Sequence, residues 1–379
     1  MIFMLTCEAF YNLLVAKGID FFAGVPDSLL KHFIGFLSDK VPASRHIIAA
    51  NEGGAVALGV GYYLATDRIP LIYMQNAGEG NTVNPLLSLA DPKVYSVPLL
   101  LVIGWRGEPG VSDEPQHAKQ GEVTLHLLTA LGIPYEVLPD ALDGAKECVG
   151  RALLAMKASN APYALVVRKD TFEPCKANND ERGTGYQLSR EKAITFLIEQ
   201  LGNRDIVVAT TGKTGRELFE YRESRGQGHE RDFLNIGAMG HASQIALGIA
   251  LQKPERRIYC LDGDGALIMH MGALAIIGER APKNFFHIVF NNGAHDSVGG
   301  QKTAGFAIDM PVIAKACGYK LALYAETEEE LKNHVKQLIV SNGPAFLEVR
   351  VKRGSRKDLG RPTMDPAEAK KAFMKFLKW

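Results

Sequence analysis

The chain has 379 residues, enough for two globular domains that each bury a core. Its composition is 46% hydrophobic and 22% charged with a formal net charge of +1, which gives no support for a nucleic-acid or membrane partner. The five cysteines stand singly, without a Cys-x-x-Cys pair, and this disfavours a disulfide framework or a zinc site. The longest apolar run, Val97–Ile103, is too short to span a membrane, and the first residues lack the basic region of a signal peptide. We therefore expect a cytoplasmic protein.

The first half of the chain alternates helical and strand patterns. An amphipathic helix over residues 5–17 precedes a short strand, Asp20–Ala23, and the turn Gly24–Ser28, where Ser28 is a candidate N-cap for the next helix. Further strands are expected at His46–Ala50, Ile69–Met74, Pro98–Ile103 and Ala164–Val167, with helices between them, one of which is the small-residue stretch Ala55–Ala65. This alternation predicts a doubly wound α/β domain with a parallel sheet over residues 1–170.

Residues 171–189 are polar and without periodicity, which is typical of a linker. The alternation then restarts and predicts a second doubly wound α/β domain over residues 190–379. Its expected strands are Asp205–Ala209, Phe233–Ile236, Arg257–Leu261, Phe285–Phe290, Lys320–Leu323 and Phe346–Val351, and its clearest helices are 190–201, His241–Ala250, one opened by a capping box from Thr327 to Glu330, and one capped by Asp365.

Two turn motifs in the second half carry polar side chains. Gly263-Asp264-Gly265 follows one expected strand and precedes a helix expected from Ala266, whereas Asn291-Asn292-Gly293 follows the next strand after an interval of 25 residues. One helix and one strand fill that interval, so both motifs should lie at the same edge of a parallel sheet. A carboxylate and an amide oxygen there suit Mg²⁺. Either motif alone is an ordinary turn, but the pair at this spacing favours a site.

Other motifs carry less information. Thr210–Thr214 ends like a Walker A loop, but Val207 occupies the first glycine position, so we reject a P-loop. That turn could still present backbone N–H groups to a phosphate, or be a plain strand–helix turn. The sequence has no G-x-S-x-G, no H-E-x-x-H, and no G-x-G-x-x-G after a strand, which disfavours α/β-hydrolase, zincin and standard dinucleotide functions.

The paired motifs resemble the metal–diphosphate motif of thiamine-diphosphate enzymes. In that family the positions of Asp264, Asn292 and the backbone carbonyl of Ala294 bind the Mg²⁺ that holds the cofactor's diphosphate. The resemblance implies further cofactor contacts from Thr211, Gly263, Gly265 and Ala266.

Two other segments match the family in order and context. Glu52 lies where a strand becomes a helix, a place where a carboxylate is also favoured by the helix dipole alone. In thiamine enzymes a glutamate at this point contacts N1′ of the cofactor pyrimidine, and such a group must be buried with a raised pKa to exchange a proton near neutrality. Gly237–Gly240 resembles the segment that supports the bent cofactor, with Met239 between its rings and the Gly237 carbonyl at its amino group. A methionine there is otherwise a core residue.

Seven segments make the resemblance more specific, to phosphonopyruvate decarboxylases, with sulfopyruvate decarboxylases as close relatives. They are Gly24–Ser28, Asn51–Gly54, Gln75–Gly78, Ile103–Glu108, Asp113–His117, Asn291–Gln301 and Gly354–Pro362. The third domain of larger 2-oxo-acid decarboxylases has no room in the short linker. The adjacent His-His pair of pyruvate decarboxylases is also missing, which disfavours pyruvate or indolepyruvate as substrate.

The resemblance implies decarboxylation of 3-phosphonopyruvate to phosphonoacetaldehyde and CO₂ with thiamine diphosphate and Mg²⁺. Glu52, Asp27, His117 and His295 are the expected catalytic residues. Substrate-binding candidates, expected in loops at the sheet edges, are Asp27, Arg106, His117, His295, Ser297 and Lys302. The basic tail with Arg353, Arg356 and Arg361 could fold over the site. Because the family builds each site from the first domain of one subunit and the second domain of its partner, we expect at least a homodimer.

Three alternatives stay open from the sequence. The first is a sulfopyruvate decarboxylase that forms sulfoacetaldehyde, and the second is a non-catalytic thiamine-diphosphate-binding module, against which Glu52 argues. The third is a nucleotide-dependent phosphotransferase that uses Asp264 and Mg²⁺, which the broken loop at Lys213 disfavours.

Overall fold

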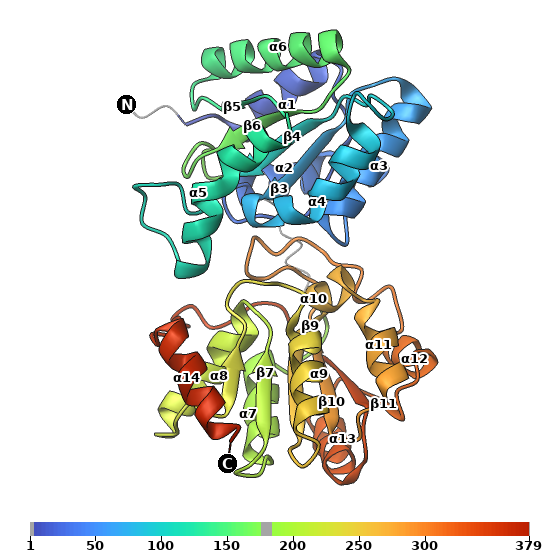
Figure 1. Ribbon diagram of the computed structural model, residues 1–379, viewed down its shortest axis with the longest axis vertical. Helices are drawn as coiled ribbons and strands as arrows, with labels where there is room; N and C mark the ends of the chain where they lie inside the picture. The colour runs from blue at the N-terminus through green and yellow to red at the C-terminus, as the bar shows by residue number, and fades with distance from the viewer. Residues whose placement is uncertain (1–3, 176–183, 379) are drawn as a thin grey trace. The chain divides into compact units, whose positions relative to one another are not determined.

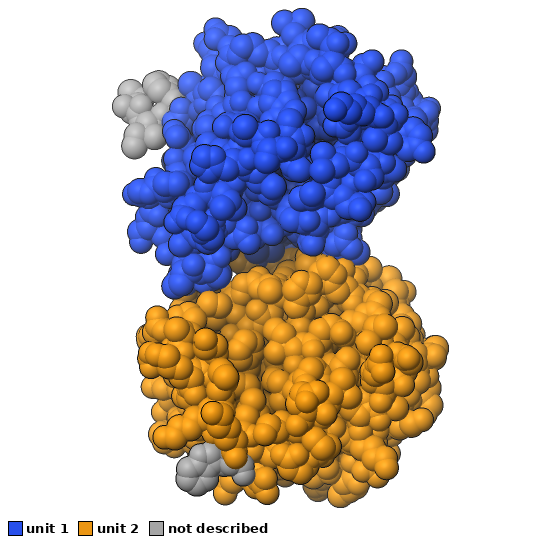
Figure 2. Space-filling view, viewed as in Figure 1, with its two compact units in different colours: residues 1–181, 298–301 blue, residues 182–297, 302–379 orange. Residues whose placement is uncertain are grey.

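The computed structural model describes residues 4–175 and 184–378. The chain forms two compact units, residues 1–181 with 298–301 (unit 1) and residues 182–297 with 302–379 (unit 2), which Figure 2 shows in different colours. Each unit contains one parallel β-sheet with helices packed on both faces (Figure 1). The predicted fold class, α/β with two doubly wound parallel sheets, is confirmed.

Unit 1 has a six-stranded sheet in the described part of the chain, in the order β2-β1-β3-β4-β6-β5, and all its strand pairs are parallel. The strands are β1 (Phe22–Gly24), β2 (His46–Ile48), β3 (Leu71–Gln75), β4 (Leu100–Gly104), β5 (Tyr135–Val137) and β6 (Tyr163–Val167). The helices are α1 (Cys7–Ala16), α2 (Lys31–Lys40), α3 (Glu52–Thr66), η1 (Asn76–Gly78), α4 (Glu79–Pro85), η2 (Leu86–Ala90), α5 (Pro115–Ala130) and α6 (Leu142–Ser159).

The central strand β4 shows how this sheet divides two cores. All five of its residues are buried, and their side chains alternate between the faces. Leu100 and Val102 pack with residues of α1, α2 and α6, whereas Leu101 and Ile103 pack with residues of α3, η2 and α5. Helices therefore cover both faces of the sheet, and polar loops lie at the edge formed by the carboxyl ends of the strands.

Unit 2 has a second six-stranded parallel sheet among its described residues, in the order β11-β12-β10-β9-β7-β8. The strands are β7 (Ile206–Ala209), β8 (Asp232–Leu234), β9 (Ile258–Gly263), β10 (Phe285–Asn291), β11 (Leu321–Ala325) and β12 (Ala345–Arg350). The helices are α7 (Arg190–Glu199), α8 (Lys213–Ser224), α9 (Ala242–Gln252), α10 (Asp264–Met269), α11 (Ala273–Arg280), α12 (Met310–Ala316), α13 (Glu328–Val340) and α14 (Pro366–Phe376).

Strand β10 is buried along its whole length and also alternates between two cores. Phe286 and Ile288 pack with α7 and α13, whereas Phe285 and Val289 pack with α9 and the helices α10 to α12. Because β9 lies beside β10 in parallel register, with Gly263 opposite Phe290, the two strands end at the same edge. The predicted arrangement of the two turn motifs rests on this register.

The start of α2 corrects one sequence prediction. Ser28 is not the N-cap, because the helix begins at Lys31 after Leu30. Asp27 binds the entering backbone instead: its Oδ2 accepts hydrogen bonds from the N–H groups of Leu29 (2.9 Å) and Leu30 (3.2 Å). A carboxylate accepts from these unpaired donors more strongly than a hydroxyl does.

The connection from the first turn motif to β10 also differs from prediction. It contains two helices, α10 and α11, and α10 begins at Asp264 rather than at Ala266. The non-helical backbone of His270, with φ −134° and ψ 46°, ends α10 after six residues.

The stretch predicted as a linker contributes to both cores. Phe172 stacks on Phe33 in unit 1 with a centroid distance of 5.3 Å, and Leu188 is buried in unit 2. Residues 176–183 of this stretch lie outside the described residues. Among the described helices, none combines the length and apolar character needed to cross a membrane.

Candidate active site

Asp264 and Asn292 meet at the carboxyl edge of β9 and β10. Both are 2% exposed, and the backbone N–H of Asn292 lies close enough to the Asp264 carboxylate to oppose the rise in its pKa. Burial raises the pKa of Asp264 to about 6, because a carboxylate in low dielectric lacks the solvation of water. The predicted convergence of the two motifs is present in the structure.

The donor groups at this edge fit a hard cation. The Asp264 carboxylate, the Asn292 amide oxygen and the Ala294 carbonyl are oxygen donors of the kind that Mg²⁺ prefers. Ala294 is 6% exposed, and its N–H donates to Asn292 Oδ1 at 3.0 Å, so the turn is compact. A buried carboxylate with a raised pKa is stabilised by a nearby positive charge, so the residues present suit the implied metal.

A loop after the second motif completes this edge, and sequence reasoning missed it. The Thr303 hydroxyl donates to Asp264 Oδ2, and Asn291 Nδ2 donates to the Gly305 carbonyl at 2.8 Å. A Cβ on Gly305 would lie 2.7 Å from Asp264 Oδ2, so only glycine fits there. The first asparagine of the pair thus anchors the loop that contacts Asp264.

His295 lies against the first motif. A Cβ on Gly265 would be 2.7 Å from His295 Cε1, so the glycine allows the imidazole to approach the backbone. Burial lowers the pKa of His295 to about 4, which leaves the ring neutral at pH 7. Ser297 and Lys302 follow on the same loop and are exposed, and Ser297 Oγ would lie 3.3 Å from a Cβ on Gly212.

The turn after β7 is tied to the turn after β8. Thr211 Oγ1 donates to the Ile236 carbonyl at 2.9 Å. Asn235, which the sequence analysis placed in a strand, leaves the sheet and uses its side chain to bind the next turn: Nδ2 donates to the Ala238 carbonyl at 2.6 Å, and Oδ1 accepts from the Ala238 N–H at 3.1 Å. This fixes the segment from Gly237 to Gly240, in which Met239 is half-buried.

Glu52 is the first residue of α3 in unit 1 and is 6% exposed. Its Oε2 accepts a hydrogen bond of 2.7 Å from Asn81 Nδ2, and burial raises the pKa of the carboxyl group. A Cβ on Gly78 would lie 2.3 Å from Glu52 Oε1, so a side chain at that position would collide with the carboxylate. The predicted acid is buried with a raised pKa, as its expected role requires.

Asp27 is fully buried in unit 1, next to Gly104 at the end of β4. Gln75 Nε2 donates to its Oδ1 at 2.5 Å, and a Cβ on Gly104 would lie 2.2 Å from its Oδ2. Burial raises its pKa, while the hydrogen bond from Gln75 opposes that shift. A carboxyl group in this state can carry a proton closer to neutral pH than a surface aspartate can.

Arg106 is paired within unit 1. Its Nε donates to Asp113 Oδ2 at 2.7 Å, a second bond joins Nη2 to Asp113 Oδ1, and Nη1 donates to Ser28 Oγ at 2.7 Å. His117 was expected in a loop but lies in the first turn of α5, which begins at Pro115. Proline at a first helical position favours this early start.

The basic tail is anchored within unit 2. Arg356 pairs with Glu191 at the start of α7, with Glu220 of α8 and with Asp358. These acids engage the guanidinium group of Arg356, while the Gly354 N–H of the same tail donates to Asp296 Oδ2 at 3.1 Å, so the start of the tail lies beside the loop of the second motif.

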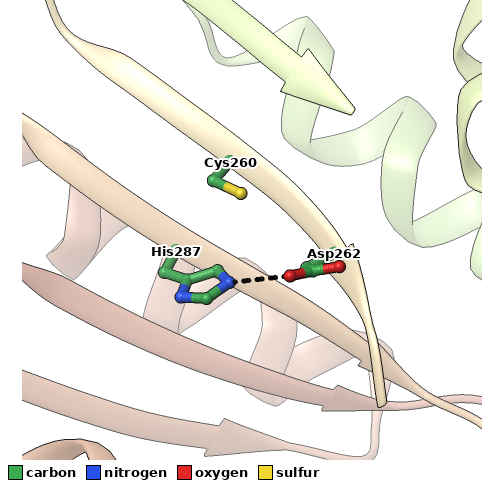
Figure 3. A group of neighbouring side chains, drawn as sticks. All are labelled: Cys260, Asp262 and His287. Atoms are coloured by element: carbon green, nitrogen blue, oxygen red, sulfur yellow. Dashed lines mark hydrogen bonds and ion pairs between the residues drawn. The ribbon is translucent and has the colours of Figure 1, made fainter. Parts of the chain in front are cut away.

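A buried polar cluster lies on β9 and β10 just before the first motif (Figure 3). His287 Nε2 is 3.4 Å from Asp262 Oδ2, and His287 Nδ1 is 3.2 Å from the Tyr319 hydroxyl. The neighbouring Cys260 lies on the same face, so three possible ligand atoms fall within 4.8 Å of one another. The Gly263 N–H donates to Asp262 Oδ1 at 2.9 Å. The histidine and the aspartate thus have protein partners, and Asp262 orients the first glycine of the motif.

Comparisons with known proteins find relatives for both halves of the chain. The model of the thiamine pyrophosphate enzyme N-terminal TPP binding domain matches residues 4–128, and that of the C-terminal TPP binding domain matches residues 210–349. Thiamine pyrophosphate is another name for thiamine diphosphate. Phosphonopyruvate decarboxylase of Streptomyces viridochromogenes is 33% identical over 96% of this chain and 93% of its own length.

The chain belongs to the thiamine-diphosphate-dependent decarboxylases. Sulfopyruvate decarboxylase of Methanosarcina acetivorans is 28% identical over 98% of this chain and 97% of its own length. The sulfopyruvate decarboxylase β subunit of Methanococcus maripaludis is 32% identical over 51% of this chain and 99% of its own length. The matches to phosphonopyruvate decarboxylases make this decarboxylase a carboxy-lyase. Separate α and β subunits of the Methanococcus maripaludis sulfopyruvate decarboxylase each match part of the chain.

Glu79 is a further buried acid of this decarboxylase, and sequence reasoning missed it. It directly follows Gly78, is 4% exposed, and its Oε1 has no hydrogen-bond partner among the described residues. Burial raises its pKa to about 8, and the Thr124 hydroxyl opposes the shift as a hydrogen-bond partner. In the sequence, Glu79 stands between two glycines in a turn-like stretch, and this pattern does not indicate that its side chain is buried.

The raised pKa of Glu79 makes stability depend on pH. The folded protein retains this proton between pH 4.5, the ordinary pKa, and about 8, whereas the unfolded chain loses it. The free energy of unfolding should therefore fall as pH rises in that range, by up to about 1.4 kcal/mol per unit. Glu79→Gln removes this loss, so the variant should gain stability over the parent between pH 5.5 and 7.5 in urea unfolding. The exposed Glu147→Gln is the control, and a parent–Glu79→Gln difference constant with pH would contradict the assignment.

Proposed function

We propose that this protein decarboxylates 3-phosphonopyruvate to phosphonoacetaldehyde and CO₂ with thiamine diphosphate and Mg²⁺. The observation that carries the proposal is the buried contact of Asp264 with Asn292, in a chain that is 33% identical to a phosphonopyruvate decarboxylase over nearly its full length. Oxygen donors from Asp264, Asn292 and Ala294 would hold the cation. When bound, thiamine diphosphate supplies a carbon nucleophile and accepts the electron pair that the departing CO₂ leaves behind.

Glu52 is proposed to exchange a proton with the pyrimidine of the cofactor. Its burial raises the pKa of the carboxyl group, which brings proton exchange closer to neutral pH than in a surface glutamate, as a group that both donates and accepts a proton requires. Asn81 donates to Oε2 and leaves Oε1 on the Gly78 side. Gly237 and Met239, on the turn fixed by Asn235, are proposed to support the rings of the cofactor.

The substrate carries a phosphonate and a carboxylate, so its site needs cations and hydrogen-bond donors. We assign these to Arg106, His117, His295, Ser297 and Lys302. Asp27, whose buried carboxyl has a raised pKa, is the proposed donor of the proton that replaces CO₂. Two features limit the anion contacts: Arg106 is already paired with Asp113, and His295 is neutral at pH 7. Lys302, an exposed lysine, is the cationic candidate of the second half.

We further propose a homodimer with active sites shared between subunits. The exposed face of α3, the helix that begins at Glu52, is apolar over Gly54, Ala57, Leu58 and Gly61. With Phe21, Ile47 and Tyr62 these residues line an open hollow of about 600 Å³. An apolar face on the helix that carries the proposed acid suits burial against a second copy.

Sulfopyruvate is the alternative substrate, favoured by the 28% identity to a full-length sulfopyruvate decarboxylase. A sulfonate has one charge less than a fully ionised phosphonate and a similar shape. The number of cations that reach the anionic group therefore decides between the two acids.

The purified protein, supplied with thiamine diphosphate and Mg²⁺, should release CO₂ faster from phosphonopyruvate than from sulfopyruvate, and only slowly from pyruvate, which offers no second anion. Initial rates over a range of each acid give kcat/KM, the quantity that measures discrimination. Faster turnover of sulfopyruvate would transfer the proposal to that acid.

Glu52→Gln is the matched control for this assay. It preserves the size of the side chain and its contact with Asn81 but cannot donate and accept a proton in the same way. We expect turnover to fall at least about 100-fold while cofactor binding persists, since one acid–base residue typically contributes 10²–10⁴. Unchanged turnover would remove the acid–base role of Glu52.

The dimer proposal predicts that the parent sediments as a dimer or larger species. Leu58→Glu places a charge on the apolar face of α3, where Leu58 is 37% exposed, and should shift the protein toward the monomer and lower activity. Leu154→Glu, at a position 71% exposed on α6, is the control and should leave sedimentation unchanged. A fully active monomeric parent would contradict shared sites.

A further inference from the structure

Asp296 receives three hydrogen-bond donors on one carboxylate oxygen. Its Oδ2 accepts from Asn292 Nδ2 at 2.6 Å, from the Gly354 N–H at 3.1 Å and from Arg190 Nη1 at 3.4 Å. The side chain is 12% exposed, so little water competes for these contacts. The shortest of the three bonds goes to the asparagine that the proposed cation site uses.

The two partners of the Asn292 amide fix which way it points. The Ala294 N–H donates to Oδ1 at 3.0 Å, while the Asp296 carboxylate faces Nδ2. A backbone N–H only donates and a carboxylate only accepts, so the reversed amide would lose both bonds. The amide oxygen is therefore directed away from Asp296, and one of its lone pairs remains for a ligand.

Asp296 is itself supported by a buried ion pair. Arg190, the first residue of α7, donates from Nε and Nη2 to Glu217 of α8 at 2.7 and 3.0 Å. The side chains of Arg190 and Glu217 are 6% and 2% exposed. Because planar bidentate pairs have little freedom, Nη1 is fixed where it meets Asp296. The network thus joins α7, α8 and the loops after β10 and β12.

We propose that Asp296 is a positioning residue that orients the Asn292 amide so that its oxygen can bind the cation of the cofactor. The proposal rests on the proposed function. Groups that orient a metal ligand by hydrogen bonding commonly change metal affinity 10- to 100-fold when they are removed. A purely structural ion pair of Asp296 with Arg190 would instead affect folding and leave the affinity of the folded protein unchanged.

Three substitutions separate these roles. Asp296→Asn keeps an oxygen acceptor for Asn292 but loses the charge, whereas Asp296→Glu keeps the charge for Arg190 but displaces the acceptor. Asp296→Ala removes both. Asp143→Ala, at an aspartate whose side chain is 91% exposed on α6, is the control.

The measurement is calorimetric titration of thiamine diphosphate into each protein with Mg²⁺ in excess, together with Mn²⁺ binding followed by electron paramagnetic resonance. We expect Asp296→Ala and Asp296→Glu to bind about 10- to 100-fold more weakly than the parent. Asp296→Asn should stay within about threefold, and Asp143→Ala should match the parent. If Asp296→Ala does not fold, the relative cofactor affinities of Asp296→Asn and Asp296→Glu test the proposal.

Two results would overturn the inference: parent-like affinity in both Asp296→Ala and Asp296→Glu, or the reverse order, in which Glu binds as the parent does and Asn binds weakly. The reverse order would show that cofactor affinity depends on the negative charge at position 296 and not on an oxygen acceptor for the Asn292 amide. Failure of the proposed function is seen separately, as absence of cofactor binding by the parent or full binding by Asp264→Ala.

Discussion

The close approach of the Asn292 backbone N–H to the buried Asp264 carboxylate is the contact on which the proposed site of the second unit depends. It exists because β9 and β10 lie in parallel register and end together, with Gly263 opposite Phe290. The same burial that brings the groups together raises the pKa of Asp264 to about 6, so the edge favours a positive charge. The fold and the proposed cation affinity thus have one origin, the closely packed ends of two central strands.

Both units bring a buried acid against a glycine. Gly78 faces Glu52 in unit 1, and Gly305 faces Asp264 in unit 2, with no space for a Cβ in either place. Close backbone approach removes water from each carboxylate, and the loss of solvation raises its pKa. In the proposed function Glu52 exchanges a proton and Asp264 binds a cation, and their partners differ accordingly: an amide donor at Glu52, and the oxygen donors of Asn292 and Ala294 beside Asp264.

The sequence predicted what depends on periodicity and on local motifs. Alternating strands and helices gave the fold class, and the interval between Asp264 and Asn292 gave their convergence, because parallel connections are regular. It did not predict Thr303 or Asp296, since contacts made by loop residues depend on tertiary folding rather than on spacing. Ser28 was the wrong cap, because Asp27 beside it offered a stronger acceptor.

The most direct test of the central claim is a crystal structure of the protein with thiamine diphosphate and Mg²⁺. It should show one ion bound by the Asp264 carboxylate, Asn292 Oδ1 and the Ala294 carbonyl, at about 2.1 Å, and shared with the diphosphate of the cofactor. An ion bound elsewhere, or a diphosphate that leaves Asp264 and Asn292 without contact to it, would contradict the account.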